Sequence, residues 1–266
     1  MKNKRFGDRI LMKEKVLAML RDIPGKIGFY YKNLTTGEEW ELNSAVPLMA
    51  ASVIKIPVLT EVFAQLEAKN ADKSEIYEIK SEDKLPSCGA LNYMHTGLAV
   101  TLQDLYTLMI ILSDNTATNL LIKKFGIENI NRRMRSLGLE KTTVNRLLFD
   151  ASDAARGKEN YISAKEIGIL LEKMYRGELV SPAASAEMLG ILKNQRLNGK
   201  MPFYFTGEVK IAHKTSEDSS ITHDVGIVFA PQPFVVCFCS NEVDVPRFET
   251  AIQQITRMLY DMQAAK

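Results

Sequence analysis

The chain contains few of the residues that mark metal-binding and disulfide-linked proteins. Its 266 residues include three His and three Cys, which do not recur with Asp or Glu at the short intervals of metal ligands. Cys237 and Cys239 are two residues apart in a strand-like run, so they share one face and cannot bridge each other, while Cys88 stands alone. The sequence therefore predicts reduced thiols, as in a cytoplasmic protein, with no metal and no other cofactor.

A large excess of charge of one sign is also missing. The 34 Lys and Arg residues are balanced by 32 Asp and Glu residues with mixed signs along the chain, which argues against a nucleic-acid partner. The longest charge-free stretch, residues 225–241, contains Pro231 and Pro233, which argues against a membrane span. Lys13 and Glu14 interrupt the segment where a signal peptide would be apolar. We expect a cytoplasmic monomer with a small-molecule substrate, or an exported protein if the native chain begins earlier.

Strand patterns lie at both ends of the chain and helical patterns lie between them. The predicted strands cover 26–32, 38–42, 208–215, 223–230 and 233–240. The predicted helices cover 10–23, 53–69, 102–113, 117–125, 127–137, 164–175, 183–193 and 247–262. This order predicts an α+β fold, with one antiparallel sheet built from both termini, flanking helices and an inserted all-helical lobe. We expect a discontinuous sheet lobe over 1–45 and 205–266, a helical lobe over 46–204, and the active site between them.

Three short motifs carry side chains that could act together in nucleophilic catalysis. They are Ser52-Val-Ile-Lys55, Ser113-Asp114-Asn115 and Lys214-Thr215-Ser216. A Ser three residues before a Lys on a helix places hydroxyl and amine on one face, and desolvation can lower the pKa of the amine enough for it to accept the hydroxyl proton. Each motif alone has an ordinary explanation, since Ser-x-x-Lys arises by chance and Ser-Asp-Asn is a common helix cap.

Taken together and in this order, the motifs resemble those of the penicillin-recognising serine enzymes, most closely the class A β-lactamase family. The resemblance continues through SDNTATNLLI at 113–122 and THDVGIVFAP at 222–231, and it covers nearly the whole chain. It implies a β-lactamase/transpeptidase-like fold. It also implies a serine hydrolase that forms an acyl-enzyme with a β-lactam or a related amide or ester.

The resemblance assigns three catalytic roles. It makes Ser52 the acylated nucleophile, Lys55 the base that activates it, and Ser113 the hydroxyl that passes a proton toward the leaving nitrogen. The backbone N–H groups of Ser52 and Glu217 would form the oxyanion hole.

The same resemblance implies a set of substrate-binding residues. Asn115 would hold Lys55 and a substrate amide, while Lys214 and Thr215 would bind a substrate carboxylate. Ser216 and Glu217 follow in the same strand motif, but Ser216 stands where the family usually has Gly, which allows a closer approach of ligand and backbone. Glu217 would repel an anionic substrate, and residues 221–223 contain no Arg that would offset its charge, so we expect poor binding of carboxylated β-lactams.

The loop before the helix at 164 departs most from the family. Class A β-lactamases carry a Glu there that positions the water which releases the acyl group, and here residues 147–149 read Leu-Leu-Phe. Asp150 is the possible substitute base, although a solvated loop acid or a helix cap is an ordinary alternative. Deacylation is therefore expected not to use the usual Glu.

Three functional hypotheses remain open on this sequence. The leading one is a β-lactamase-like serine hydrolase acylated at Ser52. The second is a cell-wall peptide carboxypeptidase or transpeptidase, or a cytoplasmic esterase. The third is a sensor that traps its ligand covalently without turnover. Such a sensor would release one equivalent of product and then no more, whereas a hydrolase would release product continuously.

Overall fold

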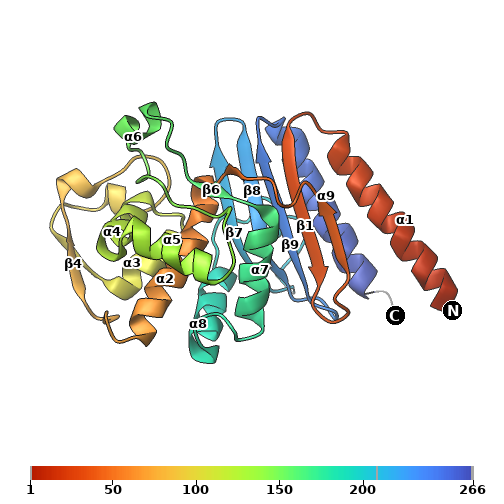
Figure 1. Cartoon of the computed structure of the whole chain (residues 1–266), viewed down its shortest axis with the longest axis horizontal. Helices are drawn as coiled ribbons and strands as arrows, with labels where there is room; N and C mark the ends of the chain where they lie inside the picture. The colour runs from red at the N-terminus through yellow and green to blue at the C-terminus, as the bar shows by residue number, and fades with distance from the viewer. Residues whose placement is uncertain (1, 208, 265–266) are drawn as a thin grey trace.

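The computed structural model describes residues 2–207 and 209–264, with the side chains of residues 2–6 left undescribed (Figure 1). At its centre is a five-stranded antiparallel sheet in the order β2-β1-β9-β8-β7. Its strands are β1 (Lys26–Asn33), β2 (Glu39–Leu42), β7 (Ile211–Asp218), β8 (Ile221–Val228) and β9 (Phe234–Asn241). Because β1 pairs with β9, the two ends of the chain build one sheet, which confirms the predicted α+β architecture.

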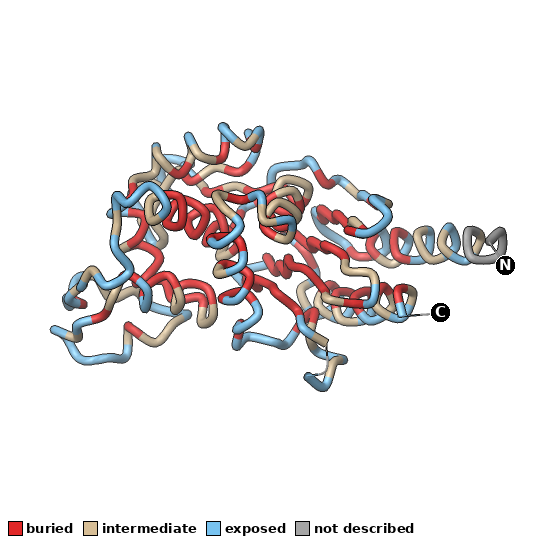
Figure 2. The backbone as a smooth tube through the Cα atoms, turned by 90° about the horizontal axis from the view of Figure 1, so that it is seen from below, coloured by how far each residue is buried: buried red, intermediate tan, exposed pale blue. Residues whose placement is uncertain are grey.

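Helices cover both faces of this sheet. On one face lie α1 (Lys2–Arg21) and α9 (Val245–Ala264), and on the other lie α7 (Ala164–Tyr175) and α8 (Pro182–Lys193) (Figure 1). The side chains of β1 alternate between two cores, since Phe29 and Tyr31 pack toward α9 whereas Tyr30 packs toward α7. Figure 2 shows long buried runs in the middle of the central sheet, where every residue of β8 and β9 is buried.

The inserted segment is mainly helical and lies at the opposite end of the molecule from α1 (Figure 1). Its helices are α2 (Lys55–Glu67), α3 (Leu102–Ile111), α4 (Asn115–Phe125), α5 (Ile127–Ser136) and α6 (Ala151–Ala155). Short 3₁₀ turns accompany them, namely η1 (Ala51–Ile54), η2 (Ser81–Asp83) and η3 (Leu91–Tyr93).

Contrary to the expectation from the sequence, the inserted segment is not all-helical. The segment also contains two small antiparallel sheets, formed by β3 (Leu48–Met49) with β6 (Tyr161–Ile162) and by β4 (Ile76–Ile79) with β5 (Leu98–Thr101). β3 and β6 have only two residues each, too few to show an alternating pattern, and neither β4 (IYEI) nor β5 (LAVT) alternates strictly between apolar and polar residues. The strand predicted over 208–215 begins at Ile211, and residue 208 lies outside the described residues. The lobe boundaries at 45 and 205 stay a prediction.

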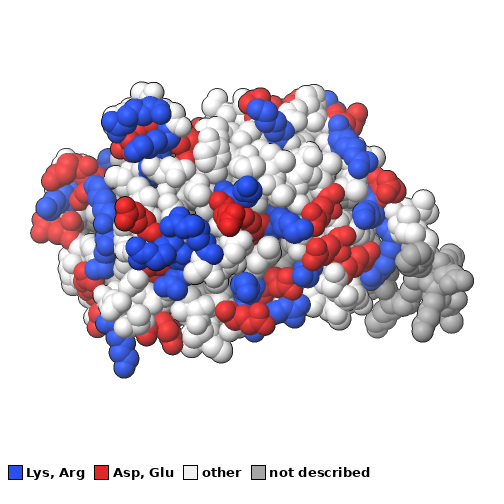
Figure 3. Space-filling model, viewed as in Figure 1, with Lys and Arg blue, Asp and Glu red and all other residues white. Residues whose placement is uncertain are grey.

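Surface charge follows the balanced composition. On the face shown in Figure 3, basic and acidic side chains are interspersed over the helices and the sheet. Among the described residues, no helix is long and apolar enough to cross a membrane.

Candidate active site

Ser52 and Lys55 are brought together by a change of helix type. Ser52 lies in the 3₁₀ turn η1, in which residues three apart are stacked, and Lys55 is the first residue of α2. The Nζ atom of Lys55 is 2.8 Å from Oγ of Ser52. Ala51 has a φ of 39°, a strained conformation for a residue with a side chain, so the turn that presents Ser52 is held by its surroundings.

The segment before Ser52 is fastened to the central sheet by hydrogen bonds. The backbone N–H of Met49 donates to Oδ1 of Asn241 (2.8 Å), and Met49 O is 2.9 Å from Nε2 of His223. Because Nδ1 of His223 accepts the N–H of Ser240 at 3.0 Å, the proton of this imidazole is on Nε2. Burial lowers the pKa of His223 to about 4, so the ring is a neutral structural bridge between β8 and the turn that carries Ser52.

Lys55 is fully buried and its amine is surrounded by oxygen atoms. Besides Oγ of Ser52, Nζ lies 2.8 Å from the carbonyl oxygen of Ser113, 2.9 Å from its Oγ and 2.9 Å from Oδ1 of Asn115. Burial, and then the positive charge on Lys214, holds the pKa of Lys55 well below its ordinary value. A neutral amine at this distance can accept the hydroxyl proton of Ser52.

The Ser-Asp-Asn motif is both a helix cap and part of this cluster. Asp114 caps α4 by accepting the N–H of Ala117 at 2.9 Å, and its other oxygen accepts the N–H groups of Ala90 and Leu91 at 2.7 and 2.9 Å. Ser113 precedes the cap with a φ of 55° and directs its hydroxyl at Lys55. The cap therefore holds the backbone of the motif in the conformation that directs Ser113 and Asn115 at the amine of Lys55.

Lys214 brings a second buried amine to the same hydroxyl. Its Nζ donates to Oγ of Ser113 at 3.1 Å, so this oxygen lies between the amines of Lys55 and Lys214. Burial lowers the pKa of Lys214 to about 7, partly offset by the negative charge of Asp224. One hydroxyl in contact with both amines provides a direct path for a proton.

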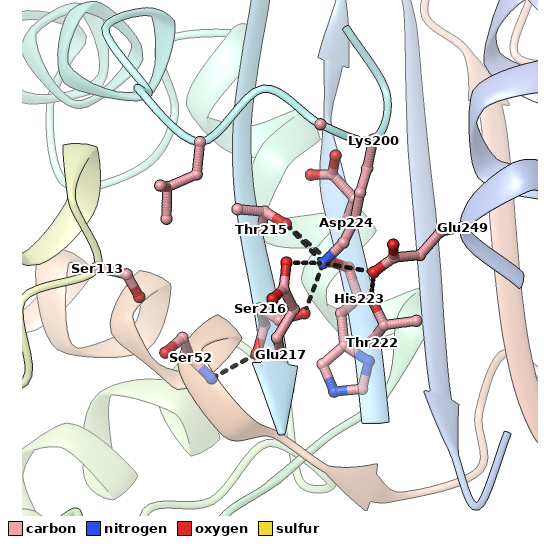
Figure 4. Close-up of polar contacts among 12 residues, drawn as sticks. Ser52, Ser113, Lys200, Thr215, Ser216, Glu217, Thr222, His223, Asp224 and Glu249 are labelled. Atoms are coloured by element: carbon pink, nitrogen blue, oxygen red, sulfur yellow. Dashed lines mark hydrogen bonds and ion pairs between the residues drawn. The ribbon is translucent and has the colours of Figure 1, made fainter. Parts of the chain in front are cut away.

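Lys200 is a functional candidate that the sequence analysis missed. It lies in the segment before β7, its side chain is only 3% exposed, and its Nζ is 3.0 Å from Oγ1 of Thr215 and 2.9 Å from the carbonyl oxygen of Ser216 (Figure 4). It also pairs with Glu217 at 3.1 Å and more loosely with Glu249 at 3.6 Å. Residues 221–223 contain no Arg, as the sequence shows, but the charge of Glu217 is offset by Lys200 from outside that segment.

A cleft of about 560 Å³ opens over Ser52. Its lining includes Ser52, Asn115, Leu148, Phe149, Asp150 and Glu217. The carboxylate of Asp150 caps α6, accepting the N–H of Asp153 at 3.0 Å and the hydroxyl of Ser152 at 2.8 Å. These bonds, the first of them most strongly, lower the pKa of Asp150, so this acid is a weak base at the rim of the cleft.

Among the described residues, no group of three or more His, Cys, Asp or Glu side chains is placed to hold a metal ion.

The hydroxyl of Ser52 lines the cleft, and a desolvated amine, a second hydroxyl and a second buried amine meet behind it, as in the serine hydrolases of the penicillin-recognising class. The family model described as the Beta-lactamase enzyme family matches residues 11–263, and the chain belongs to that family. It is a β-lactamase-like serine hydrolase, which confirms the resemblance found in the motifs.

Individual relatives agree with this assignment. A β-lactamase of Rhodobacter capsulatus is 21% identical over 238 residues, covering 88% of this chain and 81% of that protein. The crystal structure of a β-lactamase from Sphaerobacter thermophilus has a TM-score of 0.88 and 27% identity, over 96% of this chain and 98% of that one. A leucine-to-glutamate mutant of PBP-A, in an acyl-enzyme complex with penicillin G, has a TM-score of 0.84 and 27% identity, over 95% and 96% of the two chains.

Proposed function

We propose that this protein forms an acyl-enzyme at Ser52 with a β-lactam or a related amide or ester. The observation that carries the proposal is the buried amine of Lys55, 2.8 Å from Oγ of Ser52 and with a lowered pKa. In acylation, Lys55 takes the hydroxyl proton while Oγ bonds to the carbonyl carbon of the substrate. The tetrahedral intermediate then expels its leaving nitrogen or oxygen, which takes a proton through Ser113 from Lys55.

The remaining motif residues bind and orient the substrate in this proposal. Asn115 has its Nδ2 bonded to Pro86 and its Oδ1 to Lys55, so it keeps the base in place and borders the substrate cleft. Lys214 and Thr215, both buried in β7, would bind a substrate anion beside the cleft, and Lys200 adds a positive charge behind Thr215. A carboxylate bound there competes with the carboxylate of Glu217 for Lys200.

Slow release of the acyl group is the second part of the proposal. The acidic residues of the cleft lining each have other partners, as Glu159 pairs with Arg146, Glu217 pairs with Lys200, and Asp150 caps α6. Asp218, the remaining lining acid, accepts the N–H of Ser219. No carboxylate among these is free to activate water beside Ser52, so the acyl-enzyme is expected to persist.

This persistence favours a second candidate function, in which the protein traps a ligand covalently or transfers the acyl group to an acceptor other than water. Asp150 is then the candidate base for whatever hydrolysis remains. Asp150→Asn slows the release of product if that carboxylate activates water, and it leaves release unchanged if it acts only as a helix cap.

The test is intact mass over time after exposure to a penicillin and to a neutral activated ester. We expect one added acyl group on the wild type, formed within minutes and lost slowly, and none on Ser52→Ala. Labelling of Ser52→Ala at the wild-type rate would contradict the proposed nucleophile. Rapid return to the free mass, with many turnovers, would contradict slow release and favour an efficient β-lactamase.

A further inference from the structure

The hydroxyl of Ser216 lies against the backbone N–H that acylation would need. Oγ of Ser216 accepts the N–H of Ser52 at 2.6 Å, and Figure 4 shows this contact bridging β7 and the turn that carries the nucleophile. The Ser216 side chain is only 3% exposed. The contact is possible because the chain has Ser here in place of the Gly usual in the family, which has no hydroxyl.

This hydroxyl already takes the N–H of Ser52, one of the two donors that an oxyanion would use. A backbone donor stabilises an oxyanion when the oxygen lies about 2.7–3.1 Å from the nitrogen, in the direction of the N–H bond. At 2.6 Å, Oγ of Ser216 lies slightly closer than that to the nitrogen of Ser52 and already accepts its N–H, and one N–H cannot direct a full hydrogen bond at two oxygens at once. The substrate oxygen therefore has to displace the hydroxyl before Ser52 can stabilise it.

The geometry points to Ser216 as a gate of the oxyanion hole, closed in the resting protein and opened by rotation of its side chain when the acyl donor reacts. This inference rests on the proposed acylation of Ser52. The backbone at Ser216 is fixed by its pairing with His223 on β8 and by the bond from Lys200 to its carbonyl oxygen. Opening therefore involves the side-chain torsion of Ser216 rather than movement of β7.

The gate should discriminate between acyl donors. A neutral carbonyl oxygen gains little by replacing a neutral hydroxyl, whereas an oxyanion forms a stronger, charge-assisted bond to the same N–H. The resting site therefore gives little help to ground-state binding, and the hole opens only as negative charge develops. Strained or activated acyl donors, whose carbonyl carbon is attacked readily, are the substrate class that this arrangement favours over unstrained amides.

Ser216→Ala tests the gate because it removes the hydroxyl and keeps the Cβ atom. We expect the rate constant for acylation of Ser52 by a fluorescent penicillin and by a neutral activated ester to rise about tenfold, the value of one typical hydrogen bond. The half-saturation concentration should change little, and Ser216→Gly should show the same rise. Ser219→Ala, an exposed serine in the following turn, is the matched control and should acylate at the wild-type rate. An unchanged or slower rate in Ser216→Ala would overturn the inference.

A second measurement needs no acyl donor and separates this inference from the proposed function. The backbone amide of Ser52 should resonate downfield and exchange slowly with solvent in the wild type and in Ser219→Ala. In Ser216→Ala and Ser216→Gly it should move upfield and exchange at least tenfold faster. An amide of Ser52 that is identical in all four proteins would refute the gate even if acylation proceeds as proposed. The expected amide changes without acylation in any variant would instead refute Ser52 as the nucleophile.

Discussion

Replacing Leu148 by Glu is expected to convert a persistent acyl-enzyme into a hydrolysing one. Of residues 147–149, which occupy the region of the missing Glu, Leu148 and Phe149 line the cleft. Leu148 has the more firmly held backbone, since its N–H donates to Oδ1 of Asn119 and its carbonyl accepts from Nδ2 of the same residue, both at 2.9 Å. Asn119 lies one turn along α4 from Asn115, which contacts the amine of Lys55. The bonds to Asn119 therefore fix the position of residue 148 relative to the cluster around Lys55.

The size of the effect follows from this placement. A positioned carboxylate that acts as general base typically contributes about 10² to 10⁴ in rate. We expect the deacylation rate constant of Leu148→Glu to exceed that of the wild type by about 10², the lower end, because the surrounding loop is not adapted to hold a water. Leu148 is partly buried, so the substitution should also cost about 1–2 kcal/mol of stability.

The assay is the decay of the acylated mass after removal of excess penicillin, with Leu148→Gln as the matched control. Gln has nearly the same shape and a similar cost in stability, but its amide cannot take a proton from water. Deacylation should therefore accelerate only in Leu148→Glu, and the gain should disappear below about pH 4 as the new carboxyl is protonated. Equal rates in the Glu and Gln variants would refute the reasoning that a base at this position is what the cleft lacks.

Three further predictions follow from the charges of the site. The pKa of Lys214 is about 7, so its ammonium is present below that pH and lost above it. The rate of acylation by carboxylated esters, divided by the rate for neutral esters, should therefore fall about tenfold between pH 6 and 8. A constant ratio would exclude Lys214 from anion binding. Glu217→Gln removes the closer of the two carboxylates that pair with Lys200. It should raise acylation by carboxylated donors up to about fivefold, with no gain for neutral esters in the same rate assay. The pKa of His223 is about 4 in the folded chain and 6.5 in the unfolded chain. As the pH falls from 7 to 4, the unfolded chain therefore takes up this proton before the folded chain does, and the free energy of unfolding measured in urea should fall by about 3 kcal/mol. His223→Gln should lack that part of the pH dependence, and an identical dependence in both proteins would argue against the neutral bridge.

Local spacing made part of the site predictable. Ser52 and Lys55 are three residues apart, and a helical turn of either type brings such residues together whatever the rest of the fold does. The cap at Asp114 is likewise local, since a side chain that accepts the N–H three residues ahead needs only the start of a helix. The predicted helices and main strands were confirmed for the same reason, because hydrophobic periodicity reports which face of an element is buried.

Contacts across long stretches of chain were not predictable. A single Lys after an Asn-Gly pair is ordinarily a solvated side chain, and nothing near Lys200 in the sequence indicates that its amine lies behind Thr215. The bridge from His223 to Met49 joins residues 174 positions apart, and the short strand β3 that it supports is too small to leave a pattern. The sequence did show Ser in place of Gly at 216, but not where its hydroxyl would point.

The sequence by itself determined the α+β order of elements, the membership of the three motifs in one serine-hydrolase pattern, and the lack of the usual loop Glu. These follow from residue identity and from spacings within one or two turns, which the backbone geometry fixes. Only the tertiary structure decided the burial that lowers the pKa of the two amines, the partner of Glu217 and the contact of the Ser216 hydroxyl with the N–H of Ser52. Those properties depend on burial and on distances between segments far apart in the chain, which arise only when the sheet and the inserted helices pack around the cleft.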